Sequence, residues 1–278
     1  MKRTLFVLSA AAAAALLPSC NKMDSPALAS QEGPSIAKEI RFQVSDVDIS
    51  TKVSEVTGLN SFNVLATTGN EGSESKKWDA TASKSGNSYG TQKYWPSTDP
   101  SYHFYASNAA ISFNQDGSTV EGSAAADLVC AYLAQPVHNA SNTLNFIHPQ
   151  ARVGEVSVTA ASGYTLSDVS TYMANVKESG KYNIRTSAWS DCRSTDKLNL
   201  TVGTNDKYIV PGSYVMYVTY TISKGDYSAS FTKSGSVYVS QGKINSISVR
   251  IADEPAVGIS FSVNVSPWEA KAVSLILP

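Results

Sequence analysis

Apolar and polar residues alternate along most of this chain, in short runs that end at turn residues. Ile40, Phe42 and Val44 share one face of a predicted strand. The strictest alternation runs from Val257 to Val265. No stretch forms a convincing amphipathic helix, because the nearest, residues 166–176, is rich in Ser and Thr. Short strands at regular spacing predict an all-β fold of the sandwich type.

The second half of the chain carries the clearest strand pattern. Residues 214–222 predict a long strand that is apolar on both faces, and Lys224-Gly225-Asp226 supplies a hairpin turn after it. In the first half, residues 69–87 are rich in Gly, Ser, Lys and Glu. This composition predicts an exposed loop around Trp78 and Asp79.

The first residues of the chain form a hydrophobic leader. Lys2 and Arg3 precede an apolar run over 5–17. At 13 residues this run is shorter than the roughly 20 that cross a bilayer, so it predicts a secretion signal. The run ends in Leu17-Pro18-Ser19-Cys20, which resembles a bacterial lipobox and implies cleavage before Cys20 and acylation of its thiol. An ordinary signal peptide with an incidental cysteine is the alternative.

The length of the chain leaves room for one large or two small domains after the leader. Residues 21–38 are polar and contain Pro and Gly, which is typical of a flexible tether. We therefore predict four parts: a signal peptide over 1–19, a lipidated tether over 20–38, an N-terminal β-sandwich domain over 39–163 and a C-terminal β-sandwich domain over 164–278.

Charge and cysteine content narrow the classes of partner. The net charge is −1 and no basic patch stands out, so nucleic acid is not expected as a partner. If Cys20 is acylated, Cys130 and Cys192 remain as an even pair. They could form one disulfide in an oxidising compartment, or each could be a small buried apolar residue.

Candidate catalytic groups are scattered. None of His103, His138 and His148 has metal-ligand spacing to another His or Cys. No nucleophile elbow or phosphate-binding glycine loop is present, so we predict no catalytic residue, no metal and no cofactor. Trp78, Trp95 and Trp189 could stack on sugars if they are exposed, although core packing is the role expected for Trp95. A lipid-anchored surface glycan-binding module is therefore the alternative function.

Seven fragments follow one another along the chain: Leu59-Asn60-Ser61-Phe62-Asn63-Val64, Tyr94-Trp95-Pro96, Tyr102-His103-Phe104-Tyr105-Ala106, Leu144-Asn145-Phe146-Ile147-His148, Lys224-Gly225-Asp226-Tyr227, Gly242-Lys243-Ile244-Asn245, and Phe261-Ser262-Val263 leading to Pro267-Trp268. In this order, behind the lipobox, they resemble the fimbrillin-like lipoproteins of anaerobic gut and oral bacteria. This resemblance implies two tandem transthyretin-like β-sandwich domains in a structural subunit of fimbriae that acts in adhesion. It implies as partners other fimbrial subunits, the outer membrane through the lipid anchor, and a host or bacterial surface receptor.

The resemblance also implies assembly by strand exchange. In this family a trypsin-like protease removes an early strand, commonly after Thr-Arg, and a strand from a neighbouring subunit fills the groove. The matching position here reads Thr51-Lys52, which puts cleavage by a strictly arginine-specific protease in doubt. Lys52 is therefore a candidate processing site, and a solvated loop lysine is the alternative.

The C-terminal tail is the candidate donor strand. Val273, Leu275 and Leu277 alternate on one face and could add a strand to the emptied groove. Burial of three such side chains contributes roughly 5 to 9 kcal/mol gross, although ordering of the tail opposes it. Closure of the chain's own C-terminal sheet by the tail is the alternative.

Overall fold

The computed structural model describes residues 37–46, 59–98, 101–252 and 259–267, which form strands and connecting turns without a helix. The all-β prediction is thereby confirmed. Within these ranges no helix is available that could span a membrane. The strands are β1 (Glu39–Asp46), β2 (Ser61–Thr68), β3 (Ser75–Ser85), β4 (Ser88–Tyr94), β5 (Tyr102–Ser107), β6 (Ile111–Ser112), β7 (Thr119–Gly122), β8 (Cys130–Ala134), β9 (Asn142–Phe146), β10 (Ala151–Ala160), β11 (Thr165–Asn183), β12 (Ala188–Leu200), β13 (Gly203–Ile209), β14 (Gly212–Lys224), β15 (Tyr227–Val239), β16 (Lys243–Ile251) and β17 (Ile259–Pro267).

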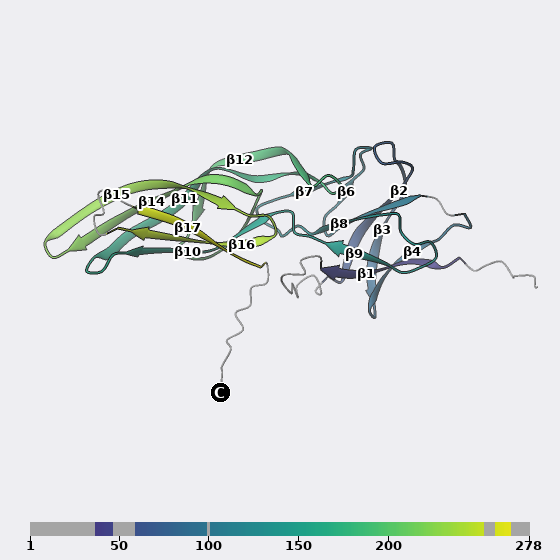
Figure 1. Ribbon diagram of the computed structural model, residues 1–278, viewed down its shortest axis with the longest axis horizontal. Helices are drawn as coiled ribbons and strands as arrows, with labels where there is room; N and C mark the ends of the chain where they lie inside the picture. The colour runs from purple at the N-terminus through teal and green to yellow at the C-terminus, as the bar shows by residue number, and fades with distance from the viewer. Residues whose placement is uncertain (1–36, 47–58, 99–100, 253–258, 268–278) are drawn as a thin grey trace, which may run out of the picture. The chain divides into compact units, whose positions relative to one another are not determined.

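Strands β1 to β5, together with β8 and β9, form one sheet of seven in the order β8-β5-β2-β3-β4-β1-β9 (Figure 1). Its two outer strands meet at a bridge between Cys130 and Ile147, whose main chains exchange hydrogen bonds of 3.0 and 2.9 Å. The sheet therefore curls round and encloses a core. Apolar side chains of alternate positions fill it, mainly Ile40, Phe42, Phe62, Val64, Ala66, Ala82, Tyr89, Trp95, Phe104, Leu144 and Phe146.

The remaining strands, β6, β7 and β10 to β17, form a two-layer sandwich. One layer has the order β13-β10-β16-β17, and the other has the order β15-β14-β11-β7-β6, with β12 paired to β11 (Figure 1). Met173, Met216 and Val218 of one layer share a buried cluster with Val156 and Ile247 of the other. The predicted β-sandwich is confirmed here, and the predicted strand over 214–222 lies within β14.

A polar cluster and an apolar cluster join the seven-stranded sheet to the β11–β12 hairpin. Tyr182 of β11 and Ile184 of the turn that follows it pack with Leu65 and Tyr105. Arg185 donates from Nη1 to Oε1 of the buried Glu74 at 2.6 Å, and the Tyr105 hydroxyl donates to the same carboxylate at 3.0 Å. Burial and this carboxylate raise the pKa of Tyr105 far above its usual value, so its hydroxyl stays a donor.

The domain boundary near residue 163 stays a prediction. The pairing does show that strands from before this residue join strands that follow it. β10 pairs with β13 and β16, and β7 pairs with β11.

The exposed loop predicted over 69–87 is wrong, because most of this segment is β3. Trp78, Ala80 and Ala82 face inward on this strand, while Asp79 and Thr81 between them and the Ser and Lys residues after them are exposed. The Trp78 ring lies 5.8 Å from that of Phe104. Two of the three inward residues are alanines, so the apolar face is too weak to outweigh the polar composition.

Candidate functional site

β1 is an interior strand of the seven-stranded sheet and the first strand of the described chain. It pairs antiparallel with β4, through Arg41–Gly90 and Phe42–Tyr89, and parallel with β9, from Phe42–Asn142 onward. Both of its neighbours come much later in the sequence. Removal of β1 would therefore expose two strand edges at once, and such edges are templates for pairing with another strand.

The inward side chains of β1 fill two sockets in the core. Ile40 and Phe42 are both completely buried. The Phe42 ring meets Phe104 edge-on, with 5.0 Å between ring centroids, and Leu144 of β9 belongs to the same cluster. The site that β1 occupies is thus an apolar groove with aromatic walls, which selects a strand with large apolar residues at alternate positions.

A bulge in β4 holds the beginning of β1. Between the pairs Glu39–Tyr94 and Arg41–Gly90, β1 has one residue and β4 has three, and Gln92 has a positive φ of 56°. Where the ladder is interrupted, the Thr91 hydroxyl donates to the Ile40 carbonyl at 2.8 Å. Because the acceptor is a main-chain carbonyl of β1, any strand that follows the same path can make this hydrogen bond.

The outer face of β1 is polar. Arg41 forms a 2.6 Å ion pair with Glu39 and donates to Ser88 at 3.1 Å. Gly90 gives this pair its room, because a Cβ there would lie 2.7 Å from Oε1 of Glu39. Arg41 lies within the strand, as the sequence predicts, and is paired there.

The end of the groove where β1 begins is built from β4 and the 135–141 loop. The Trp95 amide donates to the Lys38 carbonyl at 2.9 Å. His138 packs edge-on against the Trp95 ring and contacts the Pro96 carbonyl with Nε2 at 3.0 Å. The core position expected for Trp95 is correct, since only 2% of it is exposed.

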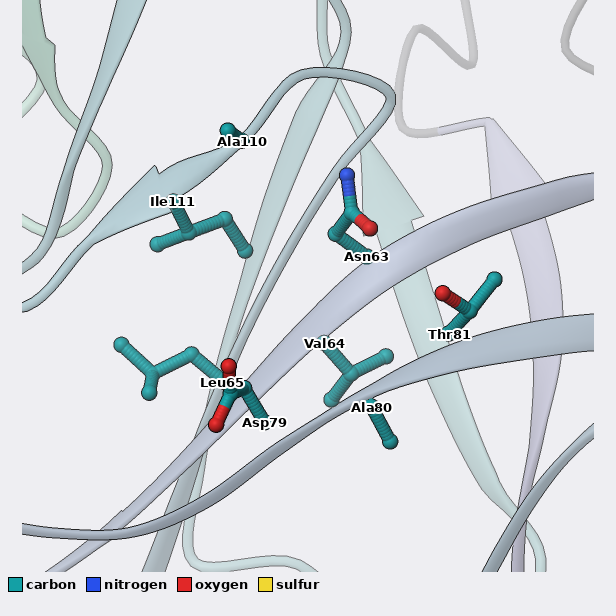
Figure 2. Close-up of a pocket in the computed structure, with 8 residues that line it drawn as sticks. All are labelled: Asn63, Val64, Leu65, Asp79, Ala80, Thr81, Ala110 and Ile111. Atoms are coloured by element: carbon teal, nitrogen blue, oxygen red, sulfur yellow. The ribbon is translucent and has the colours of Figure 1, made fainter.

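A small pocket of about 260 Å³ lies on the outer side of β2 and β3, against β6. Figure 2 shows Ile111 on one side and Asn63 with Thr81 on the other. Asn63 donates its amide to the Ala109 carbonyl at 3.0 Å, and Asp79 pairs with Lys76 at 3.0 Å. The Lys76 ammonium lowers the pKa of Asp79. The Asn63 amide and the Asp79 carboxylate of the pocket are therefore already paired with other groups of the same chain.

The histidines have structural surroundings. His103 bridges the Tyr132 hydroxyl at 2.8 Å and the Gly69 carbonyl at 2.9 Å, and His148 pairs with Asp127 at 2.9 Å. In the part of the chain that the structure describes, no three His, Cys, Asp or Glu side chains are grouped as metal ligands.

The two cysteines of the described chain, Cys130 and Cys192, are free thiols. Cys130 is fully buried, and burial raises the pKa of its thiol to about 12. It therefore packs as a small apolar side chain, one of the two alternatives that the sequence leaves open.

The tryptophans considered for sugar stacking are packed against other rings. Trp78 lies beside Phe104 and Tyr102. Trp189 lies 5.2 Å from the Tyr182 ring and donates to the Pro149 carbonyl at 3.3 Å. Neither offers an open platform of the kind that a glycan-binding module uses.

The remaining predicted site residues lie outside the described residues. These are Cys20, Lys52, Val273, Leu275 and Leu277. The structure adds the parallel partner β9 and the Thr91 contact, which the sequence did not reveal. The Leu144–Phe146 alternation indicates a strand, but no local signal shows that its partner lies about 100 residues earlier.

A family model described as fimbrillin-like matches residues 49–268. The chain belongs to the fimbrillin-like family. The resemblance seen in the sequence is thereby confirmed. The family is one of structural, non-enzymatic proteins and supports a fimbrial subunit role at the cell surface. No curated protein is similar enough in sequence to match.

Similar solved structures come from species of Bacteroides, Parabacteroides and Porphyromonas. A candidate cell adhesion protein from Bacteroides uniformis is 14% identical, with a TM-score of 0.51, over 83% of this chain and 98% of its own. One from Parabacteroides distasonis is 11% identical, with a TM-score of 0.51 and the same coverage. A fimbrilin from Porphyromonas gingivalis is 11% identical over 83% of this chain and 97% of its own, with a TM-score of 0.46. At this identity the first two likenesses concern the fold.

Proposed function

We propose that this fimbrillin-like chain is a fimbrial subunit that assembles by strand exchange, with β1 as the strand that is replaced. One observation carries the proposal: β1 is buried between two neighbours, yet it is the first strand of the described chain. A single cut between β1 and β2 leaves it held by non-covalent contacts alone. Few interior strands can be released by one cut, because most are continued by the chain on both sides.

The segment between β1 and β2 contains the predicted processing position, Lys52. Cleavage there by a protease that accepts lysine would free a fragment that includes β1. A subunit that is not cut would keep β1 and stay at the anchored end of a fimbria. Both outcomes use the same groove.

The C-terminal tail has the pattern that the groove requires. Val273, Leu275 and Leu277 have the spacing of Ile40, Phe42 and Val44. Each socket that is refilled contributes about 1.5–3 kcal/mol, and each main-chain hydrogen bond contributes about 0.5–1.5 kcal/mol. The tail lies beyond the family match, which ends at residue 268, and β1 lies before its start at residue 49. Both exchanging segments are thus outside the shared body.

Export and anchoring belong to the same proposal. Acylation of Cys20 would hold the subunit at the outer membrane until assembly. Mass spectrometry of the mature N-terminal peptide should find a fatty acid on Cys20. A Cys20→Ser variant should leave the membrane fraction, and retention of this variant there would contradict the anchor. Adhesion through a host or bacterial surface receptor is proposed from the family alone.

The test of assembly uses the chain from Asn21 onward, with a sequence-specific protease site placed between Lys52 and Gly58. After cleavage, ladders of stable polymers are expected on a gel, and they should be absent when residues 272–278 are deleted. A Lys271→Gln variant is the matched control and should still polymerise. Polymers that persist after the deletion would reject the tail as donor, and cleaved chains that stay monomeric would reject strand exchange.

A further inference from the structure

Two large apolar side chains stand exposed at the end of the groove where β1 begins. Tyr94, the last residue of β4, is 60% exposed, and Val137 is 66% exposed. Tyr94 directly precedes Trp95, and Val137 directly precedes His138. The rings of Trp95 and His138 pack against each other. The two side chains therefore belong to one end of the seven-stranded sheet, and we call them the Tyr94–Val137 patch.

The loop that carries Val137 is held in place. The Asn142 side chain accepts from the Val137 amide at 2.7 Å and donates to the Val137 and Ala140 carbonyls at 3.0 and 3.1 Å. Asn142 also pairs with Phe42 in the ladder between β9 and β1. The position of the patch relative to the groove is thus set by the same strand that forms one wall of the groove.

A buried donor lies beside the patch. The Nε1 hydrogen of Trp95 has no acceptor among the described residues, although the side chain is 2% exposed. Buried donors in folded proteins nearly always have a partner. An incoming chain at this end is one source of the missing acceptor.

The direction of β1 decides which part of an incoming strand arrives here. β1 runs parallel to β9, and its first residues contact Tyr94 and Trp95 through the Glu39–Tyr94 pair and the Lys38 carbonyl. A strand that replaces β1 in the same direction can keep the Thr91 contact and the parallel ladder. It therefore enters the groove at the Tyr94–Val137 patch.

The tail sequence then fixes what lies against the patch. If Val273 and Leu275 fill the sockets of Ile40 and Phe42, Lys271 takes the position of Lys38. Residues Trp268 to Ala270 then stand just outside the groove, at the patch. An indole has the apolar surface to cover a tyrosine and a valine, and a polar N–H that can stay in water.

We propose that the Tyr94–Val137 patch is the docking surface for Trp268 of the copy that donates its tail. This inference rests on the proposed function, since it concerns the same groove. It adds a second contact outside the groove, which distinguishes the tail of a fimbrial subunit from any other apolar strand. The patch thus supplies selectivity that two apolar sockets alone do not.

The test compares two synthetic peptides, residues 267–278 and residues 271–278, for displacement of β1 from the cleaved chain. Both keep Lys271, whose carbonyl takes the place of the Lys38 carbonyl that accepts from the Trp95 amide. The longer peptide should bind at least tenfold more tightly. Its advantage should vanish in a Tyr94→Ser, Val137→Ser double variant and in a longer peptide with Trp268→Ala. Tyr238→Ser is the matched control, because Tyr238 is also 60% exposed but lies on β15.

The outcomes separate the two proposals. Equal binding of the two peptides would overturn the patch while leaving strand exchange intact. An advantage of the longer peptide that survives the double variant would also overturn it, because Trp268 would then dock elsewhere. Failure of both peptides to displace β1 would contradict the proposed function itself.

Discussion

β1 and β14 are both interior strands, but they are held in different ways. β1 makes three register pairs with β4, with a break after Glu39, and five pairs with β9. β14 makes thirteen unbroken pairs with β15 and eight pairs with β11. In the proposed assembly, this contrast separates the strand that is exchanged from a strand that stays in the two-layer sandwich, the frame.

Chain connectivity adds to the difference. β14 and β15 are joined by a two-residue turn in which Gly225 has a φ of +58°, so each strand keeps the other close by. β1 is about 50 residues from β4 and about 100 from β9 along the chain. Closing such long loops costs conformational entropy that no short turn recovers. A cut between β1 and β2 therefore removes the covalent link that keeps β1 close to its partners, whereas the same cut leaves the link between β14 and β15 intact.

The largest effect should come from emptying a socket of β1. Phe42→Ala should lower the free energy of unfolding by about 3–5 kcal/mol, because a fully buried phenylalanine leaves a cavity between Phe104 and Leu144. Urea denaturation measures this. Phe231→Ala in β15, where the ring is only partly buried, is the control and should cost clearly less. Equal losses would mean that β1 is no more sensitive than the frame.

The next effect concerns the ion pair that joins the seven-stranded sheet to the β11–β12 hairpin. Arg185→Met should cost about 3 kcal/mol, since it leaves the buried Glu74 carboxylate without its charged partner. Adding Glu74→Gln should restore part of the loss in a double-mutant cycle. The exposed pair of Arg193 and Glu121, 3.8 Å apart, offers a control in Arg193→Met. An Arg185 effect no larger than that control would show that the joint depends on the apolar cluster alone.

A smaller effect should follow from removing the hydroxyl that holds the start of β1. Thr91→Val keeps the shape of the side chain and should cost about 1 kcal/mol, seen as faster hydrogen exchange in β1 than in β14. Thr91→Ser keeps the donor and should leave the exchange rates close to those of the parent chain. Acceleration in both variants alike would assign the effect to packing.

The mildest probe leaves the sequence unchanged. Because burial raises the pKa of Cys130 to about 12, its thiol is protonated at pH 8 and shielded from solvent. Iodoacetamide at that pH should label the partly exposed Cys192 first. Cys130 should be labelled only as the seven-stranded sheet opens, which cleavage beside β1 should accelerate. Equal labelling rates in the intact chain would contradict the closed sheet.

Sequence alone predicts the frame better than the groove. β14 has apolar residues on its inward face and a glycine turn at its end, so local pattern suffices to place it. β3 escaped detection because Ala80 and Ala82 give its inward face little apolar contrast. The parallel pairing of β1 with β9 escaped because long-range partners leave no local signal, and the β4 bulge escaped because Thr91 and Gln92 resemble ordinary surface residues.

The most direct measurement is a cysteine crosslink across the groove, in a background with Cys130→Ala and Cys192→Ser. Gln43 and Thr143 are register partners and both are exposed, so cysteines at these positions should form a disulfide within the uncut chain. In the register proposed for the tail, Ile276 takes the place of Gln43. After cleavage, cysteines at 276 and 143 should therefore crosslink one copy to the next. A disulfide from position 276 to Asn264→Cys on β17 of the same copy, with none between copies, would contradict strand exchange.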